Sequence, residues 1–308
     1  MTTLQSIGEH EAIRRLTACI KSSSPDIRVG PGDDCAVCAL PQNEPIEQVF
    51  TTDPVIEGIH FLPEENPERV GHKAVGRVLS DLAAMGAIPQ WILINVVASP
   101  EQSIEALEQI YSGMQALAHQ FGASLIGGDL AQGSRLELHL FGTGLLPPQT
   151  ALLRSTAQVG DHLLVTGKLG GSRSGKHLDF TPRVKEGIFL RETGWAHAMM
   201  DLSDGLGTDL RHILAASNVG AELHAEKIPC NGTVEEALFD GEDFELLLTV
   251  SPEHVPLLLT AWKKQFSLPL TPIGTITPHP EQLHLLHPNG KQILLQEKAF
   301  EHFKSAKK

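Results

Sequence analysis

The chain has 308 residues, 41% of them hydrophobic and 20% charged, which is typical of a soluble globular protein with one large or two smaller domains. A net charge of −13 and a single tyrosine argue against a nucleic-acid-binding surface, which needs positive charge and aromatic side chains. Because no uninterrupted apolar run reaches about 18 residues and the N-terminus lacks an apolar signal core, we expect no membrane span and no signal peptide. Four cysteines in a chain of this length indicate the reducing cytoplasm.

Apolar periodicity predicts alternating helices and strands along the whole chain. In the first half we expect helices over 8–20, over 67–79 with a continuation or kink into 81–87, and over 100–121, with strands at 35–40, 48–52, 91–98, 124–126 and 136–146. In the second half we expect strands at 162–166, 244–250, 273–276 and 282–286, and helices over 187–196, 204–216 and 252–266. The alternation favours an α/β or α+β fold. Pro147-Pro148 marks a boundary between an N-terminal domain (1–148) and a C-terminal domain (149–308).

Aspartates follow apolar runs at several points in the chain. Asp81 is the one charged residue between Arg77 and Glu101, and an unpaired carboxylate there would be costly. We therefore expect Asp81 to be neutralised, paired or bound to a metal; alternatively, Ser80 and Asp81 cap a helix that Gly86 ends. Similar runs lead into Asp33-Asp34, Asp53, Asp129 and the pair Asp201 and Asp204. If these side chains converge, they form the oxygen-rich site that Mg²⁺ prefers.

Further residues near these aspartates are candidate ligands, and each has a structural alternative. Thr51 and Thr52 offer hydroxyl oxygens but could simply end a strand, and the Gly127-Gly128 pair could allow a ligand to approach the backbone or form a bulge or a plain turn. His60 could bind a ligand or lie in the core, and Arg154 could clamp a phosphate or lie at the surface. The acids around Glu242 could likewise be solvated.

A phosphate-binding loop is a rival interpretation of Gly170–His177, which nearly matches G-x-x-x-x-G-K-[ST]. His177 stands where a hydroxyl should contact Mg²⁺, and we expect the residues that follow not to open a helix. Both parts of the phosphate-loop mechanism are then missing. We therefore predict a flexible Gly/Ser loop in which Lys176 is dispensable.

In order, the motifs GPGDDCAV, TTDPVIEGIHF, LSDLAAMGA, LIGGD, VGDHLLVTGKLGGS, TPR, MDLSDGLGTDL and GEDFELL resemble the thiamine-monophosphate kinase family, in the superfamily of aminoimidazole ribonucleotide synthetase. The resemblance implies a two-domain PurM-like architecture. Its N-terminal α/β domain would form a homodimer through its sheet, and its C-terminal domain would close over the active-site cleft. It also implies transfer of the γ-phosphoryl group of ATP to thiamine monophosphate, with several Mg²⁺ ions.

The resemblance also implies roles for individual residues. The metal ligands would be Asp34, Thr51, Thr52, Asp53, Asp81, Asp129, Asp201 and Asp204, of which Asp34, Asp81, Asp129 and Asp204 would be the catalytic acids. ATP would be held by Gly128, Asp129, Arg154 and Ser203, and thiamine monophosphate by His60, Glu242 and Phe300. This set agrees with the chemistry, because phosphoryl transfer mainly requires positioning of two phosphates and neutralisation of charge.

Three departures from the family pattern keep alternatives open. Val78 stands where the family often has Asn, Asp240 replaces the first glycine of the family's G-G-E-D, and the segment between Gly171 and Asp201 is shorter than in many relatives. The alternatives are another ATP-using enzyme of the superfamily, such as an aminoimidazole ribonucleotide or selenophosphate synthetase, and a non-catalytic nucleotide-binding protein.

Overall fold

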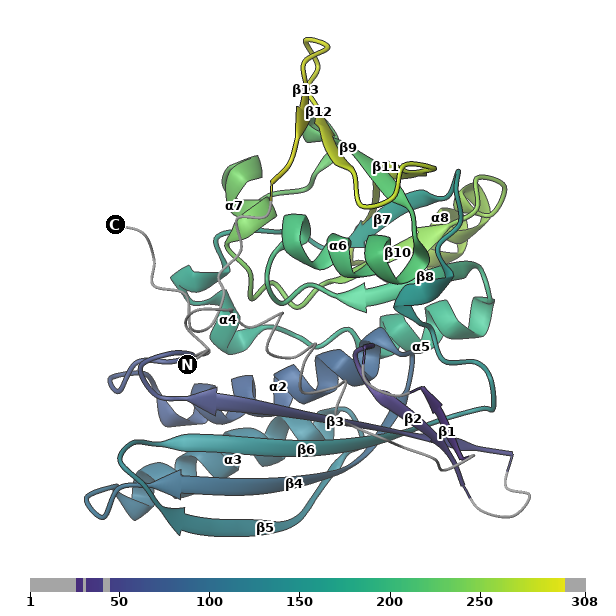
Figure 1. Ribbon diagram of the computed structural model, residues 1–308. Coiled ribbons are helices and arrows are strands. Elements are labelled where there is room, and N and C mark those ends of the chain that lie inside the picture. The colour runs from purple at the N-terminus through teal and green to yellow at the C-terminus, as the bar shows by residue number, and fades with distance from the viewer. Residues whose placement is uncertain (1–25, 30–31, 41–44, 297–308) are drawn as a thin grey trace, which may run out of the picture.

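The computed structural model describes residues 26–29, 32–40 and 45–296, which form two sheets with their helices (Figure 1). The helix predicted over 8–20 and the candidate Phe300 lie outside these residues. The predicted two-domain α/β fold class is confirmed: one sheet belongs to the first half of the chain and the other to the second half. Within the described ranges, no helix is both long enough and apolar enough to cross a membrane.

The first sheet has six strands in the order β1-β2-β3-β6-β4-β5. Neighbouring strands are antiparallel except β4 and β5, which are parallel. Along the chain its elements are β1 (Ile27–Val29), β2 (Ala36–Ala39), β3 (Glu47–Ile56), α2 (Pro67–Ala84), β4 (Ile88–Ala98), α3 (Ile104–Gln120), β5 (Ser124–Gln132) and β6 (Glu137–Leu146). Helices α2 and α3 pack together along the same side of this sheet (Figure 1).

The second sheet has seven strands in the order β13-β12-β9-β11-β7-β10-β8, with β12 and β9 the one parallel pair. Its strands are β7 (His162–Thr166), β8 (Ala196–Asp201), β9 (Gly220–His224), β10 (Leu246–Val250), β11 (Leu270–Thr277), β12 (Leu283–Leu286) and β13 (Gln292–Leu294). Its helices are α4 (Lys176–Asp179), α5 (Val184–Thr193), α6 (Leu206–Ser217), α7 (Val234–Phe239) and α8 (Val255–Gln265).

Helix α2 lies between the two halves of the molecule. It contacts β3, β6 and α3 on one side and α4, α5 and β8 on the other (Figure 1). Its contact with α3 is close: a Cβ on Gly71 would come within 2.0 Å of the Ile110 carbonyl oxygen, and one on Gly113 within 2.0 Å of that of Glu68. Larger side chains at these two positions would push the helices apart, so α2 is packed tightly against α3.

The two faces of the first sheet differ in burial. On β4, Ile92, Ile94 and Val96 are buried toward the helices, whereas Trp91 and Leu93 point outward and are 48% and 37% exposed. Phe141 on β6, which is 38% exposed, lies on the same outward face because it pairs with Leu93. The outer face of this sheet is therefore an uncovered apolar surface in the single chain.

Several predicted boundaries are wrong. Helix α3 begins at Ile104 rather than at residue 100, because the Ser103 side chain accepts a hydrogen bond from the backbone N–H of Ala106 and caps the helix. β5 runs on to Gln132, so Gly127-Gly128-Asp129 lies inside a strand rather than in a turn. The predicted continuation of the helix over 67–79 is confirmed, although the helix ends at Ala84 rather than at residue 87. Three elements, β9, β13 and α7, have no counterpart among the predicted elements.

Candidate active site

Three carboxylates meet between the two halves of the chain. Asp34 lies just before β2, Asp81 lies in the last turn of α2, and Asp201 ends β8. Each can offer an oxygen within 4.8 Å of the oxygens of the other two. This is the convergence of strand-end and helix-end aspartates that the sequence predicts, and we call Asp34, Asp81 and Asp201 the acid cluster.

The acid cluster is electrostatically unfavourable without a cation. Burial, followed by repulsion from Asp201, Asp53 and Asp34, raises the pKa of Asp81 well above its ordinary value. Burial and the charge of Asp34 raise the pKa of Asp201 to about 7. Asp81 and Asp201, which resist ionisation, and the adjacent Asp34 form a donor set suited to a hard divalent ion such as Mg²⁺.

Hydroxyl groups and an arginine complete the surroundings of the acid cluster. Thr51 donates a hydrogen bond to Asp81, and Ser80 donates one of 2.5 Å to Asp201. The Arg154 guanidinium donates two hydrogen bonds, of 2.8 and 3.1 Å, to the Asp34 carboxylate. Arg154 is therefore not a surface residue: it lies at the acid cluster, where a phosphate could compete for its donors.

The neighbouring residues of β3 point to opposite sides of the sheet. Asp53 lies on the same side as Thr51 and contributes to raising the pKa of Asp81. The Thr52 side chain lies on the other side, where its hydroxyl donates to the Leu140 carbonyl oxygen at 2.8 Å. The structure therefore brings Thr51 and Asp53 toward the acid cluster but does not bring the Thr52 hydroxyl there.

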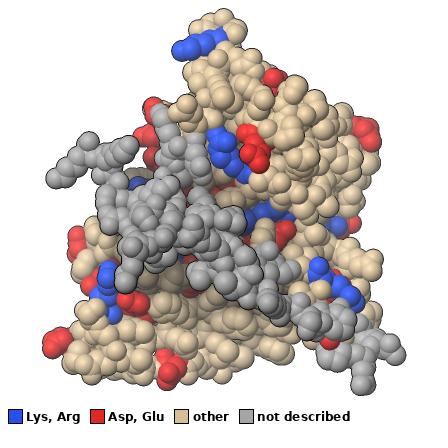
Figure 2. Space-filling model, viewed as in Figure 1, with Lys and Arg blue, Asp and Glu red and all other residues tan. Residues whose placement is uncertain are grey.

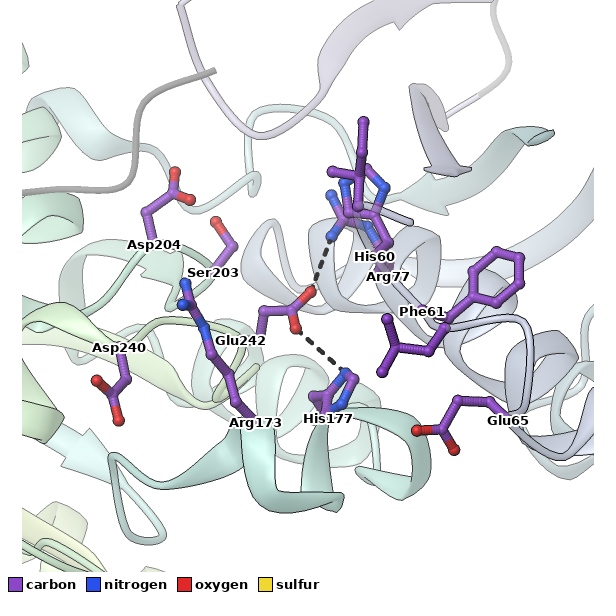
Figure 3. A pocket seen from close by; sticks show the side chains of 12 residues that line it. His60, Phe61, Glu65, Arg77, Arg173, His177, Ser203, Asp204, Asp240 and Glu242 are labelled. Carbon is purple, nitrogen blue, oxygen red and sulfur yellow. Dashed lines mark ion pairs between the residues drawn. The ribbon is translucent and has the colours of Figure 1, made fainter. Parts of the chain in front are cut away.

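A cavity of about 360 Å³ opens beside these residues (Figure 3). Figure 3 shows Ser203, Asp204 and Arg173 on one side of it and His60 and Phe61 on the other. We call this cavity the acceptor pocket; it is lined by Ile59, His60, Phe61, Leu62, Glu65, Arg77, Arg173, His177, Ser203, Asp204, Asp240 and Glu242. The candidates His60, Ser203, Asp204 and Glu242 thus lie together in one pocket. On the part of the face in Figure 2 that is not grey, acidic and basic side chains are interspersed.

Glu242 is aimed into the acceptor pocket by an unusual backbone. Its φ of 58° and the φ of 50° at Phe244 lie in the left-handed region, which costs energy for residues other than glycine. Hydrogen bonds from the Glu242 N–H to the Ser203 carbonyl oxygen and from the Phe244 N–H to that of Leu202 hold this conformation. The Asp240-Gly241 sequence is therefore compatible with a glutamate that points into the pocket.

A fully buried lysine fixes the Glu242 carboxylate. Lys73 Nζ lies 2.6 Å from Glu242 Oε1, 2.6 Å from the His60 carbonyl oxygen and 2.8 Å from His177 Nδ1, and His177 Nδ1 is 3.2 Å from Glu242 Oε2. Burial alone would raise the pKa of Glu242, but His177 and Lys73 more than offset it and hold that pKa at about 2. Glu242 is therefore a fixed negative charge facing the pocket at neutral pH.

Replacing this charge should destabilise the chain in a pH-dependent way. We expect Glu242→Gln to lower the free energy of unfolding by about 3 kcal/mol at pH 7, because Lys73 is left buried without a counter-charge. The folded pKa of about 2 lies below the ordinary 4.5, so the stabilisation is complete above pH 4.5 and is lost as the pH falls toward 2. Urea unfolding of both chains should show the gap reduced by roughly half at pH 3; a gap of the same size at both pH values would contradict this account.

Gly128 and Asp129 are not brought to the acid cluster within one chain. Asp53 pairs with Leu140, Leu140 with Ile94, and Ile94 with Gly128, so three strand spacings, roughly 14 Å, separate β3 from β5 at this level. Asp129 pairs with Asn95 and therefore faces the outer side of the sheet, away from α2. A single chain thus cannot join Asp129 to the ions that Asp34, Asp53 and Asp81 would share, which corrects that expectation.

The Gly170–His177 segment does not form a phosphate-binding loop. The expectation that no helix follows it is wrong, because α4 begins at Lys176, but α4 has only four residues. Lys176 Nζ contacts the Lys168 carbonyl oxygen at 3.1 Å and Glu245 at 3.4 Å, and Lys176 does not line the acceptor pocket. These contacts hold the loop to Glu245, directly before β10, and place the lysine outside the acceptor pocket.

We therefore expect Lys176→Ala to change the turnover of any phosphoryl-transfer reaction by less than about threefold, whereas loss of a phosphate-loop lysine would remove most of it. Steady-state rates of both chains at saturating ATP would check this. A loss of about a hundredfold would restore the phosphate-loop interpretation.

Among the site residues missing from the sequence-based candidates are Lys73 and Arg77, both on α2. Arg77 forms hydrogen bonds of 2.6 and 2.7 Å with Asp53, and its Nη1 lies 3.7 Å from Glu242. The usable signal is spacing: Lys73, Arg77 and Asp81 recur every four residues and so share one face of the helix.

Comparisons with known proteins agree along the chain. The AIR synthase related protein N-terminal domain matches residues 32–146, and the corresponding C-terminal domain matches residues 158–285. The thiamine-monophosphate kinase of Buchnera aphidicola (subsp. Acyrthosiphon pisum) is 39% identical over 305 residues, covering 89% of this chain and 92% of that protein. That of Escherichia coli is 33% identical over 327 residues, covering 96% and 98%.

Solved structures agree with these relatives. The structure named "AaThiL complexed with AMPPCP and TMP" superimposes with a TM-score of 0.84 at 27% identity, covering 98% of this chain and 99% of that one. Thiamine-monophosphate kinase from Stenotrophomonas maltophilia gives a TM-score of 0.73 at 32% identity, covering 91% and 95%.

Proposed function

The chain belongs to the thiamine-monophosphate kinase family, and on that premise we propose that it transfers the γ-phosphoryl group of ATP directly to thiamine monophosphate. The observation that carries the proposal is the adjacency of a buried acid cluster and a pocket of about 360 Å³ lined by both cationic and anionic groups. The first suits metal-bound triphosphate and the second a small phosphorylated acceptor.

The reaction requires no covalent bond to the protein. The bond between the γ-phosphorus and the β,γ-bridging oxygen breaks, a phosphate oxygen of the acceptor bonds to that phosphorus, and ADP leaves with the electron pair. An anionic phosphate acceptor needs no strong base, which fits a site rich in carboxylates. Residues of the pocket align the two phosphates and exclude water, which is the main requirement of phosphoryl transfer.

Mg²⁺ is the proposed metal. Asp34, Asp81 and Asp201 would hold it, with Thr51 and Asp53 beside them, because the oxygens of the three acids lie together and burial raises the pKa of Asp81 and of Asp201. When bound, the metal would supply positive charge against the phosphate oxygens. Arg154, at the edge of the acid cluster, would contact phosphate, and Ser203 and His60 would contact the bound substrates from the walls of the acceptor pocket.

Incubation of the chain with ATP, Mg²⁺ and thiamine monophosphate tests this function. We expect thiamine diphosphate and ADP in equal amounts, and little ADP when thiamine monophosphate is omitted. Binding of ATP without any turnover would instead favour a nucleotide-binding protein. Turnover that requires another acceptor would favour a different ATP-using enzyme of the superfamily.

We further propose a homodimer formed through the outer face of the first sheet. Its support is the apolar surface that Trp91, Leu93 and Phe141 expose there. The same association would give Asp129 a role, because it pairs with Asn95 on that side of the sheet and could reach the site of a second copy, and the neighbouring Gly128 would follow it on the edge strand β5.

Domain limits at 1–148 and 149–308 fit the division of strands between the two sheets. Residence in the cytoplasm fits Cys35, Cys38 and Cys230, which are free thiols.

A further inference from the structure

Arg77 lines the acceptor pocket, where Figure 3 shows its ion pair with Glu242, and it also contacts Asp53 beside the acid cluster. Its Nε and Nη2 contact Asp53 at 2.6 and 2.7 Å, its Nη1 lies 3.7 Å from Glu242 Oε1, and it lines the pocket. The guanidinium also lies 5.8 Å from the centre of the Phe244 ring. One cation therefore spans the proposed metal side and the proposed acceptor side of the site.

The side chain of Arg77 is suited to a group in transit between those two sides. It is 15% exposed, and the neighbouring acids raise its pKa against the effect of burial, so it keeps its charge. A guanidinium binds carboxylates and phosphates through the same pair of parallel hydrogen bonds. In the structure the Asp53 carboxylate accepts both hydrogen bonds. Because Asp53 is also a proposed Mg²⁺ ligand, a bound ion would compete with Arg77 for this carboxylate.

We propose that Arg77 is a catalytic residue that contacts the phosphoryl group as it passes from ATP to thiamine monophosphate. The proposal rests on the proposed function. In the metal-free chain, Arg77 neutralises Asp53; with both substrates bound, its donors turn to the oxygens of the transferred group. There it stabilises the charge that those oxygens carry while the bond to ADP breaks and the bond to the acceptor forms.

A purely structural role would have the opposite consequences. If Arg77 only blocked Asp53 in the absence of metal, its removal would free a metal ligand and leave phosphoryl transfer intact. Lys73 is a poor substitute for the proposed role, because it is fully buried and engaged with Glu242, His60 and His177.

The test compares Arg77→Gln and Arg77→Lys with the wild-type chain, using Arg69→Gln as control. Arg69 lies on the same helix and pairs with the carboxylate of Asp179 outside the pocket. We expect Arg77→Gln to lower kcat about 10²–10³-fold with a smaller change in the KM for ATP, and Arg77→Lys to lower kcat about tenfold because the paired donors are lost. Millimolar guanidinium should restore part of the Arg77→Gln activity, and Arg69→Gln should keep the wild-type kcat.

A binding measurement gives a second readout without turnover. In the wild-type chain, Mg²⁺, ADP, aluminium fluoride and thiamine monophosphate together should raise the melting temperature more than Mg²⁺ with a methylene analogue of ATP. Arg77→Gln should lose the first shift and keep the second. A kcat within threefold of wild type in Arg77→Gln, or, if that chain does not fold, full activity in Arg77→Lys, would overturn the proposal. An inactive wild-type chain would instead refute the proposed function.

Discussion

Asp81→Asn is expected to abolish phosphoryl transfer, with a fall in kcat of about 10³-fold, while the chain stays folded. Asparagine keeps the volume of the side chain but cannot supply the charge that attracts a divalent ion. Asp81 is buried, and the charges of Asp201, Asp53 and Asp34 all raise its pKa further. Rates measured with ATP, Mg²⁺ and thiamine monophosphate would check this, with the exposed carboxylate Glu192→Gln as a matched control.

The same substitution should alter the pH dependence of stability without metal. The folded-state pKa of Asp81 lies above its ordinary 3.8, so the folded chain binds more protons than the unfolded one and loses stability as the pH rises above about 4. Asp81→Asn lacks that loss and should be at least as stable as wild type at pH 8 in the presence of a chelator. Thermal unfolding at pH 5 and pH 8 measures the difference. Full activity in the variant would refute the metal assignment. So would a wild-type chain whose stability, relative to that of the variant, rises from pH 5 to pH 8.

Mixing two inactive chains should restore activity if Asp129 serves a partner's site. Asp129→Asn alone is expected to be inactive, as is Asp81→Asn. In a dimer of one chain of each kind, one site combines an intact Asp81 with the intact Asp129 of the other chain. Random re-association of equal amounts should therefore give about a quarter of the wild-type activity.

The controls for this experiment test separately whether the chain dimerises through the outer face and whether Asp129 acts across that interface. Each variant refolded alone should stay inactive, and Trp91→Glu introduced into both chains should prevent recovery by placing a charge in the apolar outer face. Light scattering would report the oligomeric state of every mixture. A dimer that never regains activity on mixing would show that Asp129 does not act across the interface, and a monomeric wild type would remove the interface itself.

The two-domain architecture and the acid cluster could be predicted from the motifs, because each motif is a local pattern of apolar residues followed by an acid. Apolar runs that end in an acid place Asp81 and Asp201 at the ends of buried elements, and buried ends meet where the two halves join. Asp129 shows where this reasoning fails. The same pattern precedes it, but β5 continues past it, and a sequence does not show which face of a strand a residue occupies when neither face is periodic.

Lys73 and Arg77 illustrate a different limit. Their four-residue spacing from Asp81 is visible in the sequence, yet charged residues at this spacing more often form a solvated helix face. Only the packing of α2 against both halves turns that face inward. The left-handed backbone at Glu242 is similarly hidden, because it depends on hydrogen bonds to the distant Leu202–Ser203 segment.

Helix α2 sets the distance between the two parts of the site. Lys73, beside the acceptor pocket, and Asp81, in the acid cluster, are eight residues apart on one uninterrupted helix, a rise of about 12 Å. The spacing between the two parts of the site is therefore set by one continuous helix rather than by a flexible connection between the two halves. The path that the phosphoryl group must travel is therefore set by the length of this helix segment.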